Sequence, residues 1–429
     1  MTYEEAADYL KTAALRGSRL GLERVTGLCR LLGSPQDSLE VIHVAGTNGK
    51  GSFGAMLSAI LTASGIKAGW FSSPALTGYT DHYRIGGECI TEERFAELID
   101  EVSGFAESME DKPTEFEILA AAAYLLFRQE NCGICIAECG MGGDTDATNV
   151  ISSPLLSVIT NVQHDHSGFL GSTIPEIAAH KAGIIKEGCP VIFGGSDREA
   201  LDVVRRTASR KNAPLYLPDR DSLKVIKRDI YGTDYVWTSG NGSMTIKTGL
   251  TGEYQYSNLL NVLAAAELLR KNGTEIPDAV IADSLGRVRW HGRFEVLSRS
   301  PLVIFDGAHN PDGMRSAVKT MENCFGEQKA VIVMGVMADK DYRLYGEMLT
   351  GRAERIFTVT PDNPRALAAD ALADALCGMG LTAVPCTSVR EGTELALKAA
   401  GLSGAPVVAL GSLYMYREFT EALDTLLSR

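Results

Sequence analysis

A glycine-rich turn near the N-terminus carries the side chains with the clearest chemical purpose. The segment Gly46-Thr-Asn-Gly-Lys-Gly-Ser52 follows an apolar run that ends at Ala45, and a helical pattern begins at Phe53. Glycines let backbone N–H groups converge, and the N-terminus of the following helix adds positive potential. Lys50 can reach β- and γ-phosphates. The pattern therefore predicts a loop that binds a nucleoside triphosphate.

The spacing of this loop departs from the common phosphate-loop motif. Two residues, rather than four, separate Gly46 from Gly49, and Gly51 precedes Ser52. The alternative interpretation is a glycine-rich turn between a strand and a helix, with a solvated lysine. The strand pattern before the turn and the helix pattern after it favour phosphate binding.

Further polar side chains follow the ends of predicted strands. Glu138 ends an apolar strand pattern, and a carboxylate there is suited to hold Mg²⁺ between β- and γ-phosphates. His166 closes the next strand pattern and can also bind metal. Asp306 and His309 follow a strand in the C-terminal part, and Arg293 can stabilise a phosphoryl group in transfer. Alone, each residue also fits a plain structural interpretation, such as a solvated acid at a strand end.

Two other patterns have competing interpretations. Lys181 lies in a helical pattern, where composition alone favours a solvated lysine on the helix surface. Cys132 and Cys135 form a C-x-x-C without a second pair at zinc spacing, and an apolar run follows, so we interpret them as buried thiols. The nine cysteines lack the pattern of a small disulfide scaffold and fit a reducing compartment.

The remaining sequence supplies the elements that must position these groups. Strand and helix patterns alternate, which predicts an α/β fold with a doubly wound, mostly parallel sheet and ligands at the carboxyl ends of its strands. Residues 215–250 show turn signals between short β-branched runs and predict a small antiparallel β insert. A second alternating series predicts a smaller, Rossmann-like α/β domain at the C-terminus. We therefore expect a first domain over 1–295 and a second over 296–429.

The predicted elements are given by residue range. Helices are expected at 53–63, 92–108, 115–130, near 175–186 and at 257–271. Strands are expected at 134–138, 155–161, 191–193, 302–305, 330–336, 355–359 and 406–410.

The composition is that of an ordinary globular protein. The chain has 429 residues, 45% of them hydrophobic and 22% charged, with a formal net charge of −13. This length favours two or three domains, and the negative charge argues against a nucleic-acid partner. The N-terminus lacks the pattern of a signal peptide, and no apolar run approaches the roughly 18 residues of a membrane span. We therefore expect a cytoplasmic protein without a membrane partner.

Together, these motifs resemble the folylpolyglutamate synthase and dihydrofolate synthase family of the Mur ligase superfamily. The resemblance runs nearly from end to end, and several unrelated short motifs occur in the family's order. The segments that carry it are 43–52, 72–76, 83–85, 113–117, 138–143, 146–149, 160–166, 181–184, 255–258, 292–295, 306–311 and 339–341.

The resemblance implies an ATP-dependent amide ligase. In this family, ATP phosphorylates a carboxylate of a folate or dihydropteroate, and the amino group of L-glutamate attacks the acyl phosphate. Phosphorylation supplies the leaving group, and domain closure excludes water that would hydrolyse the intermediate. The implied cofactors are ATP and Mg²⁺, and the family precedent favours a monomer.

The resemblance also implies roles for individual residues, with Asn258 expected to contact adenine and Lys181 expected to be carbamylated. The expected ATP-binding residues are Thr47, Asn48, Gly49, Lys50, Gly51, Ser52, Asn258, Arg293 and Asp306. Those expected at the metal ions are Ser73 and Glu138 for one Mg²⁺ and His166 for a second. Those expected to act in catalysis are Lys50, Lys181 and His309. The expected folate-binding residues are Thr114, Glu115, Phe116, Glu117, Thr145, Asp146 and Ala147.

Four positions depart from the family pattern. Ala75 stands where the family often has histidine, and Tyr83 stands where it has glutamate. Asp144 replaces a common arginine, and Arg19 replaces a common acid. Arg19 and Asp144 fall near segments that bind dihydropteroate in the family. They therefore bear on the conversion of dihydropteroate to dihydrofolate more than on the addition of further glutamates.

Other functions stay open at this point. A Mur-type ligase for a cell-wall precursor would share the fold, but the Thr-Asn-Gly-Lys-Gly-Ser loop and the segment around Phe116 favour folate. The phosphate loop alone also fits a small-molecule kinase. A non-catalytic ATP-binding scaffold would not need Glu138, His166 and Lys181 together.

Overall fold

The structure is a computed structural model that describes residues 1–165, 167–240 and 242–428. Contacts divide the chain into two compact units. The first contains residues 1–223 and 257–288, and the second contains residues 224–256 and the chain from Arg289 onward. The antiparallel insert thus groups with the second unit. The functional domain limits of 1–295 and 296–429 stay a prediction.

One mixed sheet forms the centre of the first unit. Its strands are β1 (Val41–Ala45), β2 (Ala68–Phe71), β3 (Tyr83–Ile85), β4 (Glu88–Cys89), β5 (Ile134–Glu138), β6 (Leu156–Ile159), β7 (Val191–Phe193) and β8 (Leu215–Tyr216). Their order is β4-β3-β2-β5-β1-β6-β7-β8, parallel from β2 to β8, with β3 and β4 antiparallel at one edge. Every residue of β1 and β5 is buried because helices cover both faces. The predicted doubly wound, mostly parallel sheet is confirmed.

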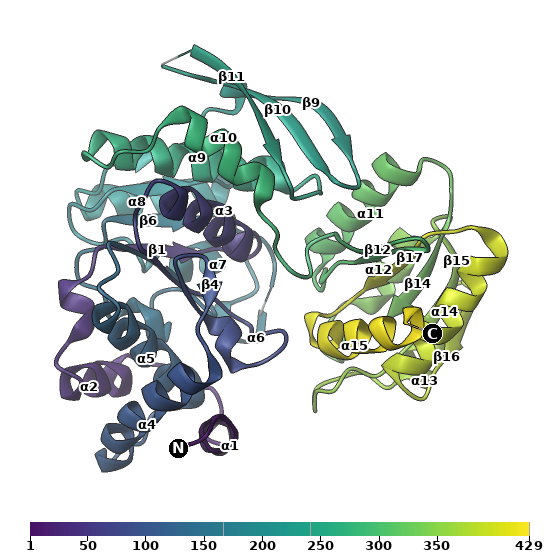
Figure 1. Ribbon diagram of the computed structural model, residues 1–429, viewed down its shortest axis with the longest axis horizontal. Helices are drawn as coiled ribbons and strands as arrows, with labels where there is room; N and C mark the ends of the chain where they lie inside the picture. The colour runs from purple at the N-terminus through teal and green to yellow at the C-terminus, as the bar shows by residue number, and fades with distance from the viewer. Residues whose placement is uncertain (166, 241, 429) are drawn as a thin grey trace. The chain divides into compact units, whose positions relative to one another are not determined.

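Helices pack on both faces of this sheet. They are α1 (Tyr3–Ala14), α2 (Glu23–Leu31), α3 (Lys50–Ala63), α4 (Glu92–Ser108), α5 (Glu115–Gln129), α6 (Ser167–Leu170), α7 (Ile174–Ala182), α8 (Arg198–Arg210), α9 (Gln255–Lys271) and α10 (Asp278–Arg287). Figure 1 shows α3, α9 and α10 on one side of the strands and α2, α4 and α5 on the other. One apolar core joins α1, α2, α4 and α5 to the strands, and another joins α7 and α8 to β6 and β7.

The second unit contains two sheets. Its strands are β9 (Leu223–Asp229), β10 (Gly232–Ser239), β11 (Gly242–Thr248), β12 (Glu295–Arg299), β13 (Leu302–Phe305), β14 (Ala330–Met334), β15 (Ala353–Thr358), β16 (Ala383–Pro385) and β17 (Val407–Leu410). The small sheet has the order β11-β10-β9, and its β10–β11 pair is antiparallel. The larger sheet has the order β12-β13-β17-β14-β15-β16, and only β12 runs antiparallel to its neighbour. The predicted insert and the second α/β domain are confirmed.

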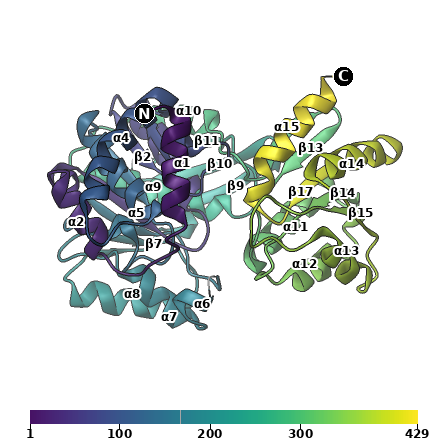
Figure 2. The ribbon, with the colours of Figure 1, turned by 90° about the horizontal axis from the view of Figure 1, so that it is seen from below.

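Helices also cover the larger sheet of the second unit. They are α11 (Pro311–Phe325), α12 (Tyr342–Leu349), α13 (Ala369–Cys377), α14 (Val389–Ser403) and α15 (Tyr416–Leu427). Figure 2 shows α14 and α15 on one side of this sheet and α11, α12 and α13 on the other. Among the helices of the described residues, none is long and apolar enough to cross a bilayer.

Some predicted elements end earlier than expected. The helix expected near 175–186 ends at Ala182, because the loop after β5 packs against its last turn. The strand expected over 155–161 ends at Ile159, after which the Thr160 hydroxyl donates to the carbonyl of Asn48. Both early ends occur where side chains of the predicted site gather.

Candidate active site

Neighbouring parallel strands bring the predicted groups of the first unit to one edge of the sheet. In the order β2-β5-β1-β6, Ser73 follows the first strand and Glu138 ends the second. The glycine-rich loop follows the third, and Thr160 follows the fourth. Adjacent strands lie about 4.8 Å apart, so these groups gather within a few strand widths.

The glycine-rich loop has no room for side chains at two of its glycines. An ideal Cβ at Gly46 would lie 1.8 Å from Oγ1 of Thr160. A Cβ at Gly49 would lie 2.1 Å from Oδ1 of Asn258, and Gly49 has a φ of +89°. Asn258 of α9 is thus placed directly against the loop. Its expected contact with adenine stays a prediction.

Side chains after β6 hold the loop in shape. Oδ1 of Asn161 accepts the backbone N–H groups of Thr47 (3.1 Å) and Asn48 (2.9 Å). Nδ2 of Asn48 donates to Oε1 of Gln163 at 2.8 Å, and Oγ1 of Thr47 donates to the Gln163 carbonyl at 3.1 Å. Asn161 and Gln163 are site residues that the sequence analysis did not assign, although Asn161 ends the predicted strand and Gln163 lies between that strand and His166.

Lys50 and the first turn of α3 supply the positive end of the loop. Gly49 is the N-cap residue, and Gly51 and Ser52 are buried in the first turn. The first N–H groups of a helix lack intrahelical partners, so they can bind an anion. Nζ of Lys50 donates to the carbonyl of Gly46 at 3.0 Å. This arrangement suits the phosphates of a nucleotide.

Glu138 supplies a buried carboxylate next to the loop. Its side chain is 3% exposed, and its residue pairs with Val44 two positions before the loop begins. Mg²⁺ prefers oxygen ligands and takes only one or two carboxylates beside phosphates and water. Among the described residues, no three His, Cys, Asp or Glu side chains cluster as metal ligands, and His166 lies outside those residues. A single carboxylate at the phosphate loop fits a magnesium ion held mainly by a nucleotide.

Lys181 is not a solvated lysine, so that interpretation is wrong. The residue is 3% exposed in the last turn of α7. Burial, and to a smaller extent the charge of Lys50, lower the pKa of Lys181 to about 7. A large share of this side chain is therefore a neutral amine at neutral pH, and a neutral amine is nucleophilic.

The expected folate-binding segment at the start of α5 forms several polar contacts within the protein. Thr114 and Glu117 form a reciprocal capping box. Glu117 also forms a buried ion pair with Arg24, with 2.9 Å between Oε1 and Nη2. Oε1 of Glu115 accepts a hydrogen bond from the Tyr79 hydroxyl at 2.5 Å, and burial raises the pKa of Glu115. These polar groups have protein partners, and their contact with folate stays a prediction.

Phe116 belongs to this segment, and its ring lies against the loop after β5. Its ring centroid is 5.9 Å from that of Phe71, and a Cβ at Gly140 would lie 2.6 Å from its ring. The half-buried ring thus presents an aromatic surface beside the loop that follows Glu138. Such a surface can stack on a flat heterocycle.

Asp146 shapes the loop after β5. Oδ2 accepts the N–H of Met141 at 2.8 Å, and Oδ1 accepts the Thr148 hydroxyl at 2.6 Å. Burial raises the pKa of Asp146. Thr145 is half-buried and Ala147 is buried beside it. The structure assigns Asp146 a clear part in loop geometry, and substrate contact by these three residues stays a prediction.

Three departures from the family pattern have protein partners. The buried Tyr83 hydroxyl donates to the carbonyl of Leu119 at 3.0 Å. Nη1 of Arg19 donates to Oδ1 of Asp111 at 2.7 Å. Asp144 pairs with a histidine of α7. The charges of Arg19 and Asp144 are thus engaged within the first unit.

In the second unit, Asp306 gathers three donors at the end of β13. Oδ2 accepts the N–H of Phe294 at 2.9 Å and the hydroxyl of Tyr254 at 3.0 Å, and Oδ1 accepts the N–H of Ala308 at 2.8 Å. Burial raises the pKa of Asp306, and the guanidinium of Arg293 opposes this shift. Phe294 is buried with a φ of +46°, a strained conformation that its bond to Asp306 helps to hold.

His309 lies three residues after Asp306. Its Nδ1 donates to the carbonyl of Gly307 at 2.8 Å, which leaves Nε2 on the other side of the ring. Arg293 and His309 are both half-buried. The second unit therefore brings Arg293, Asp306 and His309 to one strand end, as the sequence order predicts for an α/β sheet.

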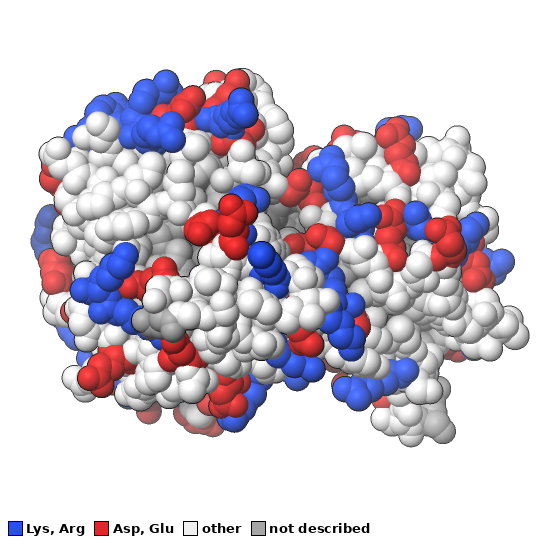
Figure 3. All heavy atoms as spheres, turned by 90° about the horizontal axis from the view of Figure 1, so that it is seen from above, with Lys and Arg blue, Asp and Glu red and all other residues white. Residues whose placement is uncertain are grey.

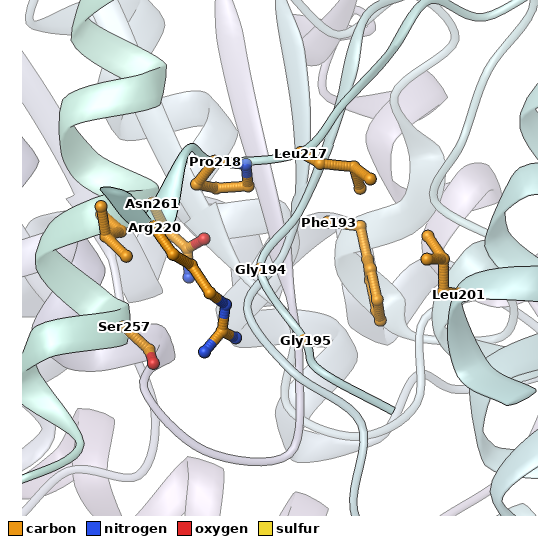
Figure 4. A pocket seen from close by; sticks show the side chains of 10 residues that line it. Phe193, Gly194, Gly195, Leu201, Leu217, Pro218, Arg220, Ser257 and Asn261 are labelled. Carbon is orange, nitrogen blue, oxygen red and sulfur yellow. The ribbon is translucent and has the colours of Figure 1, made fainter. Parts of the chain in front are cut away.

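A cavity of about 190 Å³ lies beyond β7 in the first unit. Figure 4 shows Ser257 and Asn261 of α9 on one side of it and Phe193, Leu201 and Leu217 on the other. Oδ1 of Asn261 is buried and accepts no hydrogen bond from the described residues, and its Nδ2 donates to the Thr160 carbonyl at 3.4 Å. The cavity is apolar on one wall and polar on the other.

Comparisons with known proteins define the class of this fold and site. Residues 44–266 match the model of the Mur ligase middle domain, and residues 292–413 match that of the Mur ligase, glutamate ligase domain. The chain is therefore an ATP-dependent ligase with Mur ligase domains.

The particular family follows from curated relatives and solved structures. The chain is 35% identical over 382 residues to the dihydrofolate synthase/folylpolyglutamate synthase of Bacillus subtilis, covering 87% of this chain and 88% of that protein. It is 33% identical to the folylpolyglutamate synthase of Lacticaseibacillus casei, covering 97% of each. A Mycobacterium tuberculosis folylpolyglutamate synthase complexed with ADP and AMPPCP aligns with a TM-score of 0.89 at 28% identity, over 100% of this chain and 98% of that one. The chain belongs to the folylpolyglutamate synthase/dihydrofolate synthase family.

Proposed function

We propose that this protein joins L-glutamate to a folate in a reaction driven by ATP. The observation that carries the proposal is the phosphate loop closed by Asn258, with the buried Glu138 carboxylate on the neighbouring strand. A second support is the aromatic surface of Phe116 beside the same loop region. An E. coli relative has been solved in complex with DHPP and ADP, and it aligns with a TM-score of 0.84.

The first chemical step transfers the γ-phosphoryl group of ATP to a carboxylate of the folate. The bond between the β-bridging oxygen and the γ-phosphorus breaks, and a new bond to the carboxylate oxygen gives an acyl phosphate and ADP. Lys50 and the N–H groups at the start of α3 stabilise the negative charge on the phosphates. Glu138 and Ser73 are the residues proposed to hold Mg²⁺, which would neutralise charge between the β- and γ-phosphates.

The second step forms the amide bond. The amino group of L-glutamate attacks the acyl carbon, a tetrahedral intermediate collapses, and inorganic phosphate leaves with the electron pair of the broken C–O bond. Water must be excluded, because it would attack the same carbon. In the second unit, Arg293, Asp306 and His309 are proposed to serve ATP and the reacting groups.

Lys181 is proposed to carry a carbamate. The neutral amine attacks CO₂ to give a carbamate and one released proton, which turns a cation into an oxygen ligand. The low pKa and burial of Lys181 support this step, since only an unprotonated amine reacts. A Lys181→Ala variant should lose most turnover.

Polyglutamation is favoured over dihydrofolate synthesis as the main activity. Arg19 and Asp144, which depart from the family pattern near the dihydropteroate segments, both hold protein partners. Their charges are therefore not set toward a ligand. We also propose that the protein is a monomer in the cytoplasm. Basic and acidic side chains are interspersed on the face drawn in Figure 3, and this face has no extended basic surface for nucleic acid.

The test measures ADP release with L-glutamate and either tetrahydrofolate or dihydropteroate. Turnover with tetrahydrofolate alone is the expected result, and turnover with both would make the enzyme bifunctional. Release of ADP that does not depend on L-glutamate would point to a kinase. If no ADP is released with either pterin, the proposal is overturned, provided that calorimetry shows ATP binding and correct folding.

A further inference from the structure

Asp144 and His180 form a hydrogen-bonded side-chain pair between the loop after β5 and the last turn of α7. Nδ1 of His180 lies 2.9 Å from both carboxylate oxygens of Asp144, so the ring donates to the carboxylate. The side chains are 35% exposed for His180 and 39% exposed for Asp144. A polar side-chain pair this open to solvent contributes little to global stability. Its effect is therefore local to the two elements that it joins.

The backbone around the pair fits closely onto the helix end. The N–H of Asp144 donates to the carbonyl of His180 at 2.9 Å, which satisfies one of the last carbonyls of α7. A Cβ at Gly143 would lie 2.7 Å from that carbonyl oxygen, and a Cβ at Gly183 would lie 2.3 Å from the Asp144 Cβ. Glycine on both sides permits this approach. The loop and the end of α7 are therefore joined by backbone contacts, and the side-chain pair adds a further link between them.

Groups of the proposed reaction lie directly on either side of the pair. Lys181 follows His180 in α7, and its side chain is buried. Glu138 ends β5 just before the loop that contains Asp144. Asn149, in the short helical turn Ala147–Val150, donates from Nδ2 to the Asp144 carbonyl at 3.0 Å. A shift of the loop against the helix would displace the Lys181 amine from the strand end that carries Glu138.

We propose that Asp144 and His180 are a positioning pair that fixes Lys181 relative to the loop after β5. Neither residue touches reacting atoms in this proposal, and both act through Lys181. The inference rests on the proposed function, because the role of Lys181 is itself proposed.

A charge swap tests the pair. Asp144→Arg replaces the acceptor of the His180 ring by a guanidinium that cannot accept, and His180→Glu places two acids face to face. Each single variant should lower kcat by about tenfold or more, since a small misplacement near a reacting centre is costly. The double variant D144R/H180E joins the same two positions by a guanidinium donor and a carboxylate acceptor and should regain most of the lost kcat. KM for ATP should stay unchanged in all three, because the phosphate loop is anchored elsewhere, by Asn161.

A matched control uses an exposed ion pair of the first unit. Asp202 and Arg205 of α8 lie 3.1 Å apart, with side chains 63% and 56% exposed. Reversing both charges there should leave kcat unchanged. His180→Gln serves as a conservative variant, because its amide can still donate to Asp144, and it should retain most of the activity. These variants also guard against a failure of the single charge variants to fold.

A readout beyond activity separates positioning from a purely structural role. Added bicarbonate should partly restore turnover of the single variants, if a displaced Lys181 holds its carbamate less well, while melting temperatures stay close to that of the wild type. If the fold-loss in kcat of the double variant equals or exceeds the product of the fold-losses of the two single variants, the proposal is overturned. Wild-type turnover of Lys181→Ala would overturn the proposed role of Lys181 itself, whatever the charge swap gives.

Discussion

The side-chain oxygen of Asn258 occupies the space into which a side chain at Gly49 would project. A Cβ there would lie 2.1 Å from Oδ1, and the φ of Gly49 is +89°. The phosphate loop is thus shaped by a residue of α9, more than 200 positions later in the chain. Loop and helix must fit each other for phosphate to bind.

Gly49→Ala should therefore weaken ATP binding by about a hundredfold or more, because strain and a clash both fall on the loop. Calorimetric titration with ATP measures the effect. Gly65→Ala is the matched control, since Gly65 has a φ of +81° but open space around its Cβ position. The control should cost stability and leave ATP affinity intact. Equal ATP affinity in both variants would contradict the prediction.

Replacing Lys181 should change stability in a manner that depends on pH. The pKa of Lys181 is about 7 in the folded protein, against an ordinary value of 10.5. Between these values the unfolded chain binds more protons, so this group makes stability rise with pH from about 7 to 10.5. Below pH 7 the full destabilisation caused by burying the charged Lys181 is present. Lys181→Met should thus be more stable than the wild type at pH 7, by an amount on the order of a few kcal/mol.

Urea unfolding at pH 7 and pH 10 in CO₂-free buffer measures this difference. The advantage of Lys181→Met should shrink at the higher pH. A constant difference between the two pH values would show that the amine is not the cause.

His43 should make the protein sensitive to acid. Its side chain is fully buried in β1, and burial lowers its pKa to about 3. Stability from the neutral ring is fully present above the ordinary pKa of 6.5 and is lost as pH falls from 6.5 toward 3, because the unfolded chain gains a proton first. His43→Gln should remove part of this slope in unfolding measured between pH 7 and 4. A slope that His43→Gln leaves unchanged would contradict the prediction.

The buried pair of Arg24 and Glu117 should matter for stability. Their side chains are 8% and 4% exposed. Removing Glu117 leaves the buried Arg24 guanidinium with only the long, more exposed ionic contact to Asp111 at 3.5 Å, so Glu117→Ala should lose about 3 kcal/mol in urea unfolding. Glu110→Ala, at an exposed position nearby in the chain, should lose almost nothing. A large rise in KM for folate without loss of stability would instead favour a direct substrate role for Glu117.

Gly140→Ala should weaken the binding of folate and leave the binding of ATP unchanged. The added Cβ would lie 2.6 Å from the Phe116 ring, which must then turn or shift. KM for folate should rise about tenfold, in keeping with a misplaced aromatic contact, while KM for ATP stays within error. Gly104→Ala in α4 has open space and serves as the control. Equal changes in both KM values would point to general damage.

Local patterns in the sequence were enough to predict the central sheet and the loop after β1. The run from Val41 to Ala45 and the one from Ile134 to Glu138 are continuous and apolar, which is typical of strands buried on both faces. Strand ends then indicate where polar groups gather. Burial of Lys181 could not be read locally, because it depends on the loop that folds over the end of α7.

The features that the sequence did not predict depend on partners far away in the chain. Nothing near Asn161 in the sequence reveals that it holds the N–H groups of Thr47 and Asn48. Likewise, the partner of Glu117 in its buried ion pair is Arg24, which lies 93 positions earlier in the chain. The grouping of the antiparallel insert with the second unit also depends on contacts between distant segments.

The position of β1 in the sheet has a consequence for synthesis on the ribosome. β1 lies between β5 and β6, whose residues begin at Ile134 and Leu156. The apolar strand made first must therefore wait for roughly the next hundred residues before either neighbour exists, and non-local pairing of this kind is slow. Until then, nascent chains should expose an unpaired strand that chaperones can bind, and ribosome-bound fragments that stop before β5 should fail to retain ATP.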